Sequence, residues 1–273
     1  MPFDNSLKNN QTPERVRALC QLVEYAAYTR EEVAQLLQPF STKRETTKQI
    51  LTFSTSGKLV IEQDKKLYSA LPPGAAQDPR LFRRTIIQNA HQQPDLVFHR
   101  FTAWALGKGQ ELMVSKADQM ELMFFDEVSR KSTTNREYNK FNITAWMDWA
   151  GYLGYGFSHN SHFLVNPALR IEEALFFDEA LEREKSMPFR QFMQWLNRSV
   201  PELDGGAYHE QVYASRQDQR LSYALSVGLR TLHQQGVIRL NTVKDASDVW
   251  YLTPSKLHEV SSAVTEFTIR GGR

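Results

Sequence analysis

The chain has 273 residues, of which 41% are hydrophobic, 11% aromatic and 23% charged. This is a globular composition, and it excludes a disordered, collagen-like or low-complexity protein. The formal net charge of +2 is too small to indicate a nucleic-acid-binding protein by itself. At roughly 100–150 residues per domain, the length predicts two or three domains.

Three further features narrow the class of protein. The single cysteine, Cys20, excludes an internal disulfide and a cysteine-based zinc site. The longest apolar runs, such as residues 122–125, are far shorter than the about 20 residues that cross a bilayer. Residues 1–5 lack the basic start and apolar core of a signal peptide. We therefore expect a cytoplasmic protein with no membrane association.

The N-terminal region has the element order of a winged helix. Residues 1–11 are polar and are expected to fray. The predicted elements are helices from Thr12, from Thr29 and over 41–53, then strands over 58–61 and 67–71 around a turn at 63–66. Thr29 and Glu32 form a capping box, and Pro13 suits a first helical position. Three helices followed by a β-hairpin make a helix-turn-helix with an appended wing.

The C-terminal region repeats this pattern without residue-level identity. The predicted helices follow Pro188, run over 207–215 and start after Ser222, with Gly236 at the position of a C-terminal glycine. Strands at 237–240 and 249–252 are expected to form a second wing. The dipeptide Thr253-Pro254 predicts a last helix with Leu257, Val260, Ala263, Val264 and Phe267 facing inward.

The middle of the chain is predicted to be helical, with aromatic residues on the buried faces of the helices. We predict helix starts near Asp78, Asp95, Ser115, Thr134 or Asn135, and Asn166. The expected fold is therefore mainly α, with tandem winged-helix modules flanking a helical central domain. The predicted boundaries are 1–72, 73–185 and 186–273.

The motifs of the sequence favour a protein that is not an enzyme. The sequence has no P-loop, no dinucleotide-binding glycine motif, no HExxH and no GxSxG elbow. His159 and His162 are the only close histidine pair, and nothing in the spacing supplies further metal ligands. Cys20 lies beside an apolar helix stripe and is expected to be a core residue. We expect no catalytic residue, no cofactor and no metal.

Nucleic-acid contact by the first module is the stronger hypothesis. Its third helix is the one that would enter a major groove. The candidate DNA-binding residues are Lys43, Arg44, Thr46, Thr47 and Lys48 on this helix, and Lys58, Lys65 and Lys66 on the wing. Hydroxyl and basic groups suit phosphate contacts, and Arg44 could read a guanine edge. Glu45 in the same helix opposes a purely electrostatic interaction, so a protein-binding winged helix stays open as the alternative.

The second module is a poorer DNA-binding candidate. Its predicted wing carries Lys244 but also Asp245 and Asp248, whose charges repel phosphate. The expected exposed face of its third helix has one side chain that is always positively charged, Arg230. We interpret this module as a protein–protein interaction module.

Three stretches resemble the DpdG-like family of bacterial Dpd islands. The first stretch contains Trp146, Trp149, residues 152–156 and Asn166-Pro167. The second stretch is 203–208. The third stretch contains residues 221–229, Gly236 and residues 244–246. The sequence departs from the expected pattern at Asn166, where an acidic residue is expected. These motifs are structural, so no catalytic residue carries over from the family.

The resemblance implies an accessory subunit in defence against foreign DNA. Dpd islands place 7-deazaguanine derivatives in DNA and restrict unmodified DNA. The implied partners are double-stranded DNA and helicase, ATPase or nuclease subunits of the same system, and a homodimer is possible. The alternatives are a winged-helix accessory subunit of an SMC-type ATPase, a winged-helix transcription regulator, and an enzyme of unrecognised type built around His159 and His162.

Overall fold

A computed structural model describes residues 3–4, 6–40, 43–131, 137–213, 219–255 and 261–270. The described part is mainly α-helical, with eleven α-helices and small antiparallel sheets, as predicted. It forms two compact units of two segments each, Met1–Phe98 with Ala117–Leu153 and His99–Lys116 with Gly154–Arg273. The division into three domains remains a prediction. None of the described helices is both long and apolar enough to cross a lipid bilayer.

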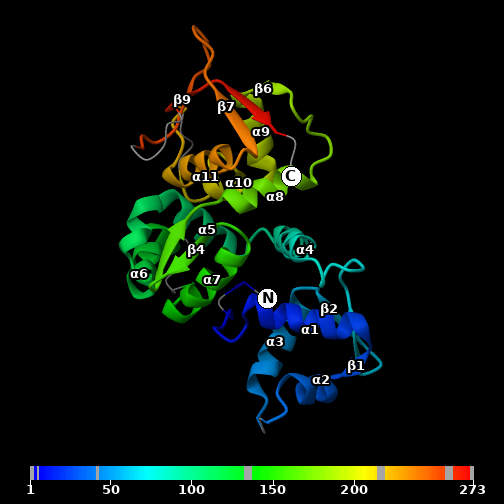
Figure 1. The fold of residues 1–273 in the computed structure, drawn as a ribbon. Helices are drawn as coiled ribbons and strands as arrows, with labels where there is room; N and C mark the ends of the chain where they lie inside the picture. The colour runs from blue at the N-terminus through cyan, green and yellow to red at the C-terminus, as the bar shows by residue number, and fades with distance from the viewer. Residues whose placement is uncertain are drawn as a thin grey trace. The chain divides into compact units, whose positions relative to one another are not determined.

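The first unit begins with three helices and three short strands, of which Figure 1 labels α1, α2, α3, β1 and β2. The elements in chain order are α1 (Pro13–Tyr25), β1 (Tyr28–Thr29), α2 (Arg30–Leu37), α3 (Glu45–Ser56), β2 (Val60–Gln63) and β3 (Lys66–Ser69). The predicted helices and hairpin are confirmed, although α3 starts at Glu45 because Arg44 precedes it in the left-handed conformation, with φ +47°. Residues 41–42 lie outside the described part. The strand β1 was not predicted, and it makes the sheet order β1-β3-β2.

The rest of the first unit is helical. It contains α4 (Pro79–His91), the start of α5 (Val97–Lys108), α6 (Ala117–Glu127), η2 (Ser129–Lys131) and α7 (Lys140–Tyr152). The start of α4 after Asp78 is confirmed, because the Asp78 carboxylate accepts the N–H groups of Arg80 and Leu81. The helix start expected at Thr134 or Asn135 falls outside the described residues. Asn139 caps α7 instead, through a capping box with Asn142.

The N-terminal segment is fixed, so the prediction that residues 1–11 fray is wrong for its described part. Phe3 is 2% exposed and packs edge-on against Phe53 and Trp149. Its carbonyl accepts a hydrogen bond from the Tyr138 hydroxyl at 2.8 Å. The polar composition of this segment concealed the two buried anchors, Phe3 and Leu7.

The second unit contains most of α5 and η1 (Gly109–Val114), followed by the remaining elements of the chain. They are β4 (Gly156–His159), β5 (His162–Val165), α8 (Ala168–Phe177), β6 (Ser186–Pro188), α9 (Phe189–Ser199), α10 (Ala207–Glu210), α11 (Tyr223–Gln234), β7 (Ile238–Asn241), β8 (Trp250–Tyr251), β9 (Ala263–Val264) and β10 (Glu266–Ile269). The predicted starts of α8 and α11 are confirmed. Gly236 has the expected positive φ of +73°. The helix expected over 207–215 is only the four-residue α10, and residues 214–215 lie outside the described part.

The end of the second unit differs most from prediction. The last helix expected after Thr253-Pro254 is wrong in its second half, because residues 263–264 and 266–269 are strands. The β-branched residues of 264–269 favour an extended chain, and β10 lies in the middle of the sheet β6-β10-β7. The predicted pairing of the second wing is also wrong, since β7 pairs with β10 while β8 pairs with β9. The expected inward residues Leu257 and Val260 lie outside the described part.

The two units have a similar order of elements, although the second unit has α10 between α9 and α11 and the strands β8 and β9 between β7 and β10. In the first unit it is α1, β1, α2, α3, β2, β3 with the sheet order β1-β3-β2. In the second unit it is α8, β6, α9, α11, β7, β10 with the sheet order β6-β10-β7, and α8 packs against α11.

Candidate functional site

The helix α3 carries the first group of candidate DNA-binding residues. Its inner face buries Ile50, Leu51 and Phe53 in the core of the first unit. Lys48 points outward and is exposed, as is Lys43 before the helix, while Thr46 is half-buried. The apolar periodicity of α3 thus places Lys48 on its outer face.

Thr47 is buried in the contact between α2 and α3. Its side chain is fully buried. Its N–H and its hydroxyl both donate to Gln38 Oε1, each at 2.9 Å. Thr47 therefore fixes α3 against the end of α2, and the exposed face of α3 does not include it.

Arg44 is constrained by its surroundings. It is half-buried, and its guanidinium Nη1 lies 4.0 Å from Glu31 Oε1 on α2. Its positive φ is uncommon for a residue with a side chain, and it turns the chain into α3. The neighbouring acids Glu31 and Glu45 are both exposed and reduce the positive potential of this face.

The hairpin β2–β3 carries the remaining candidate residues. Lys58, Lys65 and Lys66 are all exposed. Asp64 and Lys65 form a two-residue turn with φ values of 49° and 62°, the conformation that matches the twist of a tight hairpin. The turn therefore presents Lys65 and Lys66 at the end of the hairpin.

An ion pair that sequence reasoning missed ties this hairpin to α2. Arg30 donates from Nε and Nη2 to Glu62 Oε2, at 3.0 and 2.7 Å. The hydrogen bond from Arg30 lowers the pKa of Glu62 below its ordinary value. Both residues are exposed charges 32 positions apart, and no spacing rule links them.

The second unit contains a mixed polar and aromatic pocket of about 200 Å³. Its lining includes Asn197, Asp204, Tyr213, Ser222 and Trp250. Asp204 Oδ2 accepts the backbone N–H of Ser222 at 2.5 Å, which joins the 203–208 turn to the start of α11. Two of the three stretches that carry the family resemblance therefore meet around one pocket.

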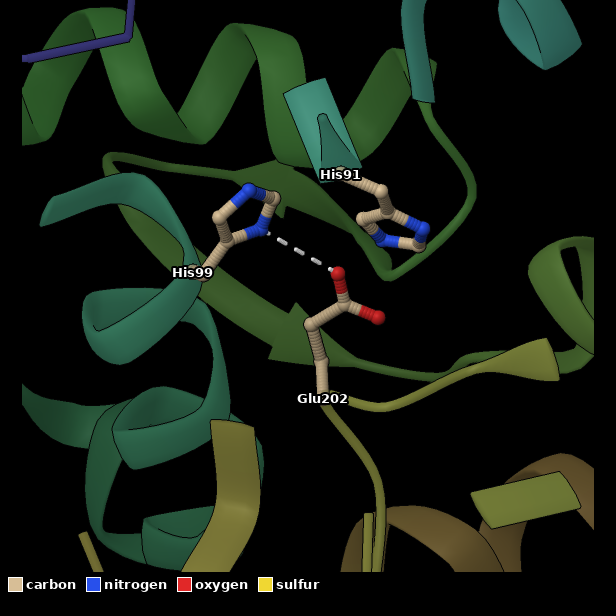
Figure 2. A group of neighbouring side chains, drawn as sticks. All are labelled: His91, His99 and Glu202. Atoms are coloured by element: carbon tan, nitrogen blue, oxygen red, sulfur yellow. Dashed lines mark ion pairs between the residues drawn. The ribbon is translucent and has the colours of Figure 1, made fainter. Parts of the chain in front are cut away.

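A buried contact between a histidine and a glutamate lies beside this region of the second unit. His99 Nδ1 is 3.4 Å from Glu202 Oε1, and both side chains are 1% exposed (Figure 2). The Tyr208 ring stacks on the His99 ring with centroids 4.1 Å apart. Figure 2 also draws His91, which belongs to the first unit. No spacing rule predicts this buried contact, because its two residues are 103 positions apart in the chain.

The histidine pair of the sequence analysis lies on a hairpin. His159 and His162 face each other at the ends of β4 and β5, with Asn160 and Ser161 as the turn. Among the residues that the structure describes, neither histidine belongs to a group of three potential metal ligands. The third ligand that an enzyme built around this pair would need is therefore not supplied by described residues.

Cys20 is a core residue of α1, as predicted. It is completely buried, and burial raises the pKa of its thiol to about 12. A thiol with this pKa is fully protonated near pH 7 and is a poor nucleophile.

Comparison with known proteins identifies one family. The family described as DpdG-like matches residues 6–246, which is most of the chain. No curated protein and no solved structure matches the chain.

Proposed function

Because the chain belongs to the DpdG-like family, we propose that it is a non-catalytic subunit of a bacterial Dpd defence system. In this role it binds double-stranded DNA through its N-terminal module and a helicase, ATPase or nuclease subunit through its C-terminal module. The mechanism is positional, since the chain holds a motor or nuclease on DNA and performs no chemistry itself.

The proposal rests on the first module being a winged helix. The observation that carries it is the succession of three helices and a hairpin with the sheet order β1-β3-β2. In this arrangement α3 is the recognition helix and the β2–β3 turn is the wing. The exposed Lys43 and Lys48 lie at α3, and Lys65 and Lys66 lie at the wing, where each would contact phosphate oxygens.

The C-terminal module is proposed to bind protein. Its succession α8, β6, α9, α11, β7, β10 supports a second winged helix. Arg230 on its third helix, the one cation expected on the exposed face, is only 2% exposed. This leaves the helix without the exposed positive charge that DNA contact requires. The pocket around Asp204 and Trp250 is a concave feature that a partner's side chain could enter.

A second candidate function is a protein-binding role for both modules, as in an accessory subunit of an SMC-type ATPase. Phe40, just before α3, is completely exposed, and Leu36 on α2 is 55% exposed. Exposed apolar side chains of this size favour a protein contact.

Fluorescence anisotropy with a labelled duplex separates the two candidates. The double variant Lys43→Glu/Lys48→Glu is expected to lower duplex affinity at least about tenfold and to reduce the slope of log K against log salt by about 2. The matched control is Lys116→Glu/Lys185→Glu, which makes the same charge change at exposed positions of the second unit. Equal losses of duplex affinity in both variants, or unchanged affinity in Lys43→Glu/Lys48→Glu, would show that α3 does not contact DNA.

A further inference from the structure

A hollow of about 310 Å³ opens on the surface of the first unit beside α3. One wall is the N-terminal segment with Lys8, Asn9 and Asn10. The other walls are Gln49 of α3 and the start of α7 at Asn139 and Phe141. The hollow therefore lies directly beside the helix that is proposed to contact DNA.

The walls are held in place by buried hydrogen bonds. The Asn142 side chain donates to the Leu7 carbonyl at 2.7 Å, and the Trp149 indole N–H donates to the Gln11 carbonyl at 2.6 Å. Gln11 in turn donates from its side chain to the Gln49 carbonyl at 3.0 Å. A site whose walls are already fixed loses little conformational entropy when a ligand binds.

The lining has an unusual chemistry. It contains five carboxamide side chains and one lysine, and no carboxylate. Asn139 and Asn142 use their side chains in the capping box of α7, whereas Asn9 and Asn10 are exposed. A carboxamide offers a donor and an acceptor side by side, which matches the edge of a nucleobase. Phe141 is 60% exposed, and the Lys140 ammonium lies 5.2 Å from the centre of its ring. An exposed ring is a stacking platform for a base, and the lysines suit a phosphate.

We propose that this hollow binds one unpaired nucleotide of a DNA strand that α3 also contacts. The inference rests on the proposed function, because α3 brings the DNA to the site. A paired base faces the helix axis of the duplex, so a hollow in the protein can receive only a base that has left the stack. The exposed Asn9 and Asn10 would read the base edge, Phe141 would stack on its face, and Lys8 would contact the phosphate.

The test compares three labelled DNA probes by fluorescence anisotropy. They are a fully paired duplex, the same duplex with one unpaired nucleotide, and a single strand of the same sequence. The expected result for the unchanged protein is tighter binding of the duplex with the unpaired nucleotide than of the fully paired duplex. Phe141→Ala is expected to abolish this preference with a loss of about tenfold in affinity for the unpaired and single-stranded probes, and to leave the paired duplex within about twofold.

The control is Phe157→Ala, since Phe157 is also exposed, at 52%, and lies on β4 of the second unit. It should leave all three affinities unchanged. Equal binding of the paired and unpaired probes by the unchanged protein, or an equal loss for all probes in Phe141→Ala, would overturn the inference. In either case, a selective loss of duplex binding in Lys43→Glu/Lys48→Glu would leave the proposed function standing. Binding of none of the three probes would refute both.

Discussion

Gln38 Oε1 accepts two hydrogen bonds from Thr47, one from the backbone N–H and one from the hydroxyl, both at 2.9 Å. Gln38 follows the last residue of α2, and Thr47 lies in the first turn of α3. The first four N–H groups of a helix have no partner within it, so the Gln38 side chain satisfies one of them. This pair fixes the angle between the two helices of the proposed helix-turn-helix.

Replacing Thr47 with Val tests this assignment. The variant removes the hydroxyl bond and keeps the N–H bond, so the free energy of unfolding is expected to fall by about 1 kcal/mol. Because Thr47 is fully buried, duplex affinity should stay within about twofold. Urea denaturation and fluorescence anisotropy measure the two effects. A large loss of DNA affinity with unchanged stability would show that Thr47 contacts DNA and would contradict this assignment.

Cys20 is expected to be unreactive in the folded protein. Burial raises the pKa of its thiol to about 12, so almost no thiolate is present at pH 8. A colorimetric thiol reagent should detect less than about one tenth of an equivalent in native protein and a full equivalent in guanidinium chloride. Because Cys20 is the only cysteine, the signal needs no assignment. Rapid stoichiometric reaction in native conditions would contradict the buried placement.

The Asp248 carboxylate should make the second unit sensitive to acid. Arg190 donates two hydrogen bonds to it, both at 3.0 Å, and the pKa of Asp248 lies below its ordinary value of 3.8 chiefly because of them. A carboxylate with a lowered pKa stabilises the fold above its unfolded pKa, and this stability is lost as pH falls through the folded pKa. The loss is therefore expected below about pH 4.

This effect is expected to be small, because Arg190 is largely solvent-exposed and water screens the pair. The measurement is urea denaturation from pH 6 to pH 2.5. Asp248→Asn should reduce stability at pH 6 and show a shallower fall in acid than the unchanged protein. Parallel pH profiles for the two proteins would show that Asp248 does not couple folding to protonation.

The sequence predicted elements best where a local signal was strong. Thr29 with Glu32, Asp78 before Pro79, and Ser222 all cap helices as expected, because capping depends on residues within one turn. The failure after Thr253 has a different cause. A short run with Val264, Phe267 and Ile269 suits a helix face or a central strand, and only its pairing with β6 and β7 decides between them.

The candidate site was predictable to the same extent. The prediction that Lys43 and Lys48 lie on the face away from Ile50 and Leu51 agrees with the structure, where both lysines are exposed. The same pattern placed Thr47 outward, because its bond to Gln38 depends on how two helices pack. The ion pair of Arg30 with Glu62 and the hollow beside Gln49 join distant segments, which no spacing rule detects.

Gly206 and Gly236 are expected to respond differently to substitution by alanine. A Cβ atom at Gly206 would overlap the Pro201 carbonyl oxygen and lie 2.5 Å from the Pro201 Cα. That carbonyl accepts the N–H groups of Tyr208 and His209, so the clash would displace the start of α10. Gly206→Ala should therefore cost about 2–4 kcal/mol of unfolding free energy.

Gly236 provides the matched comparison in the same unit. Its φ is +73°, and a Cβ atom there would meet nothing within 4 Å. Gly236→Ala should lower the free energy of unfolding by only about 1 kcal/mol, which is the cost of a left-handed backbone conformation for a residue with a side chain. Thermal and urea denaturation of the two variants measure the difference. Equal losses would mean that the turn at 204–206 can shift away from Pro201, and that its close approach to that residue does not constrain the fold.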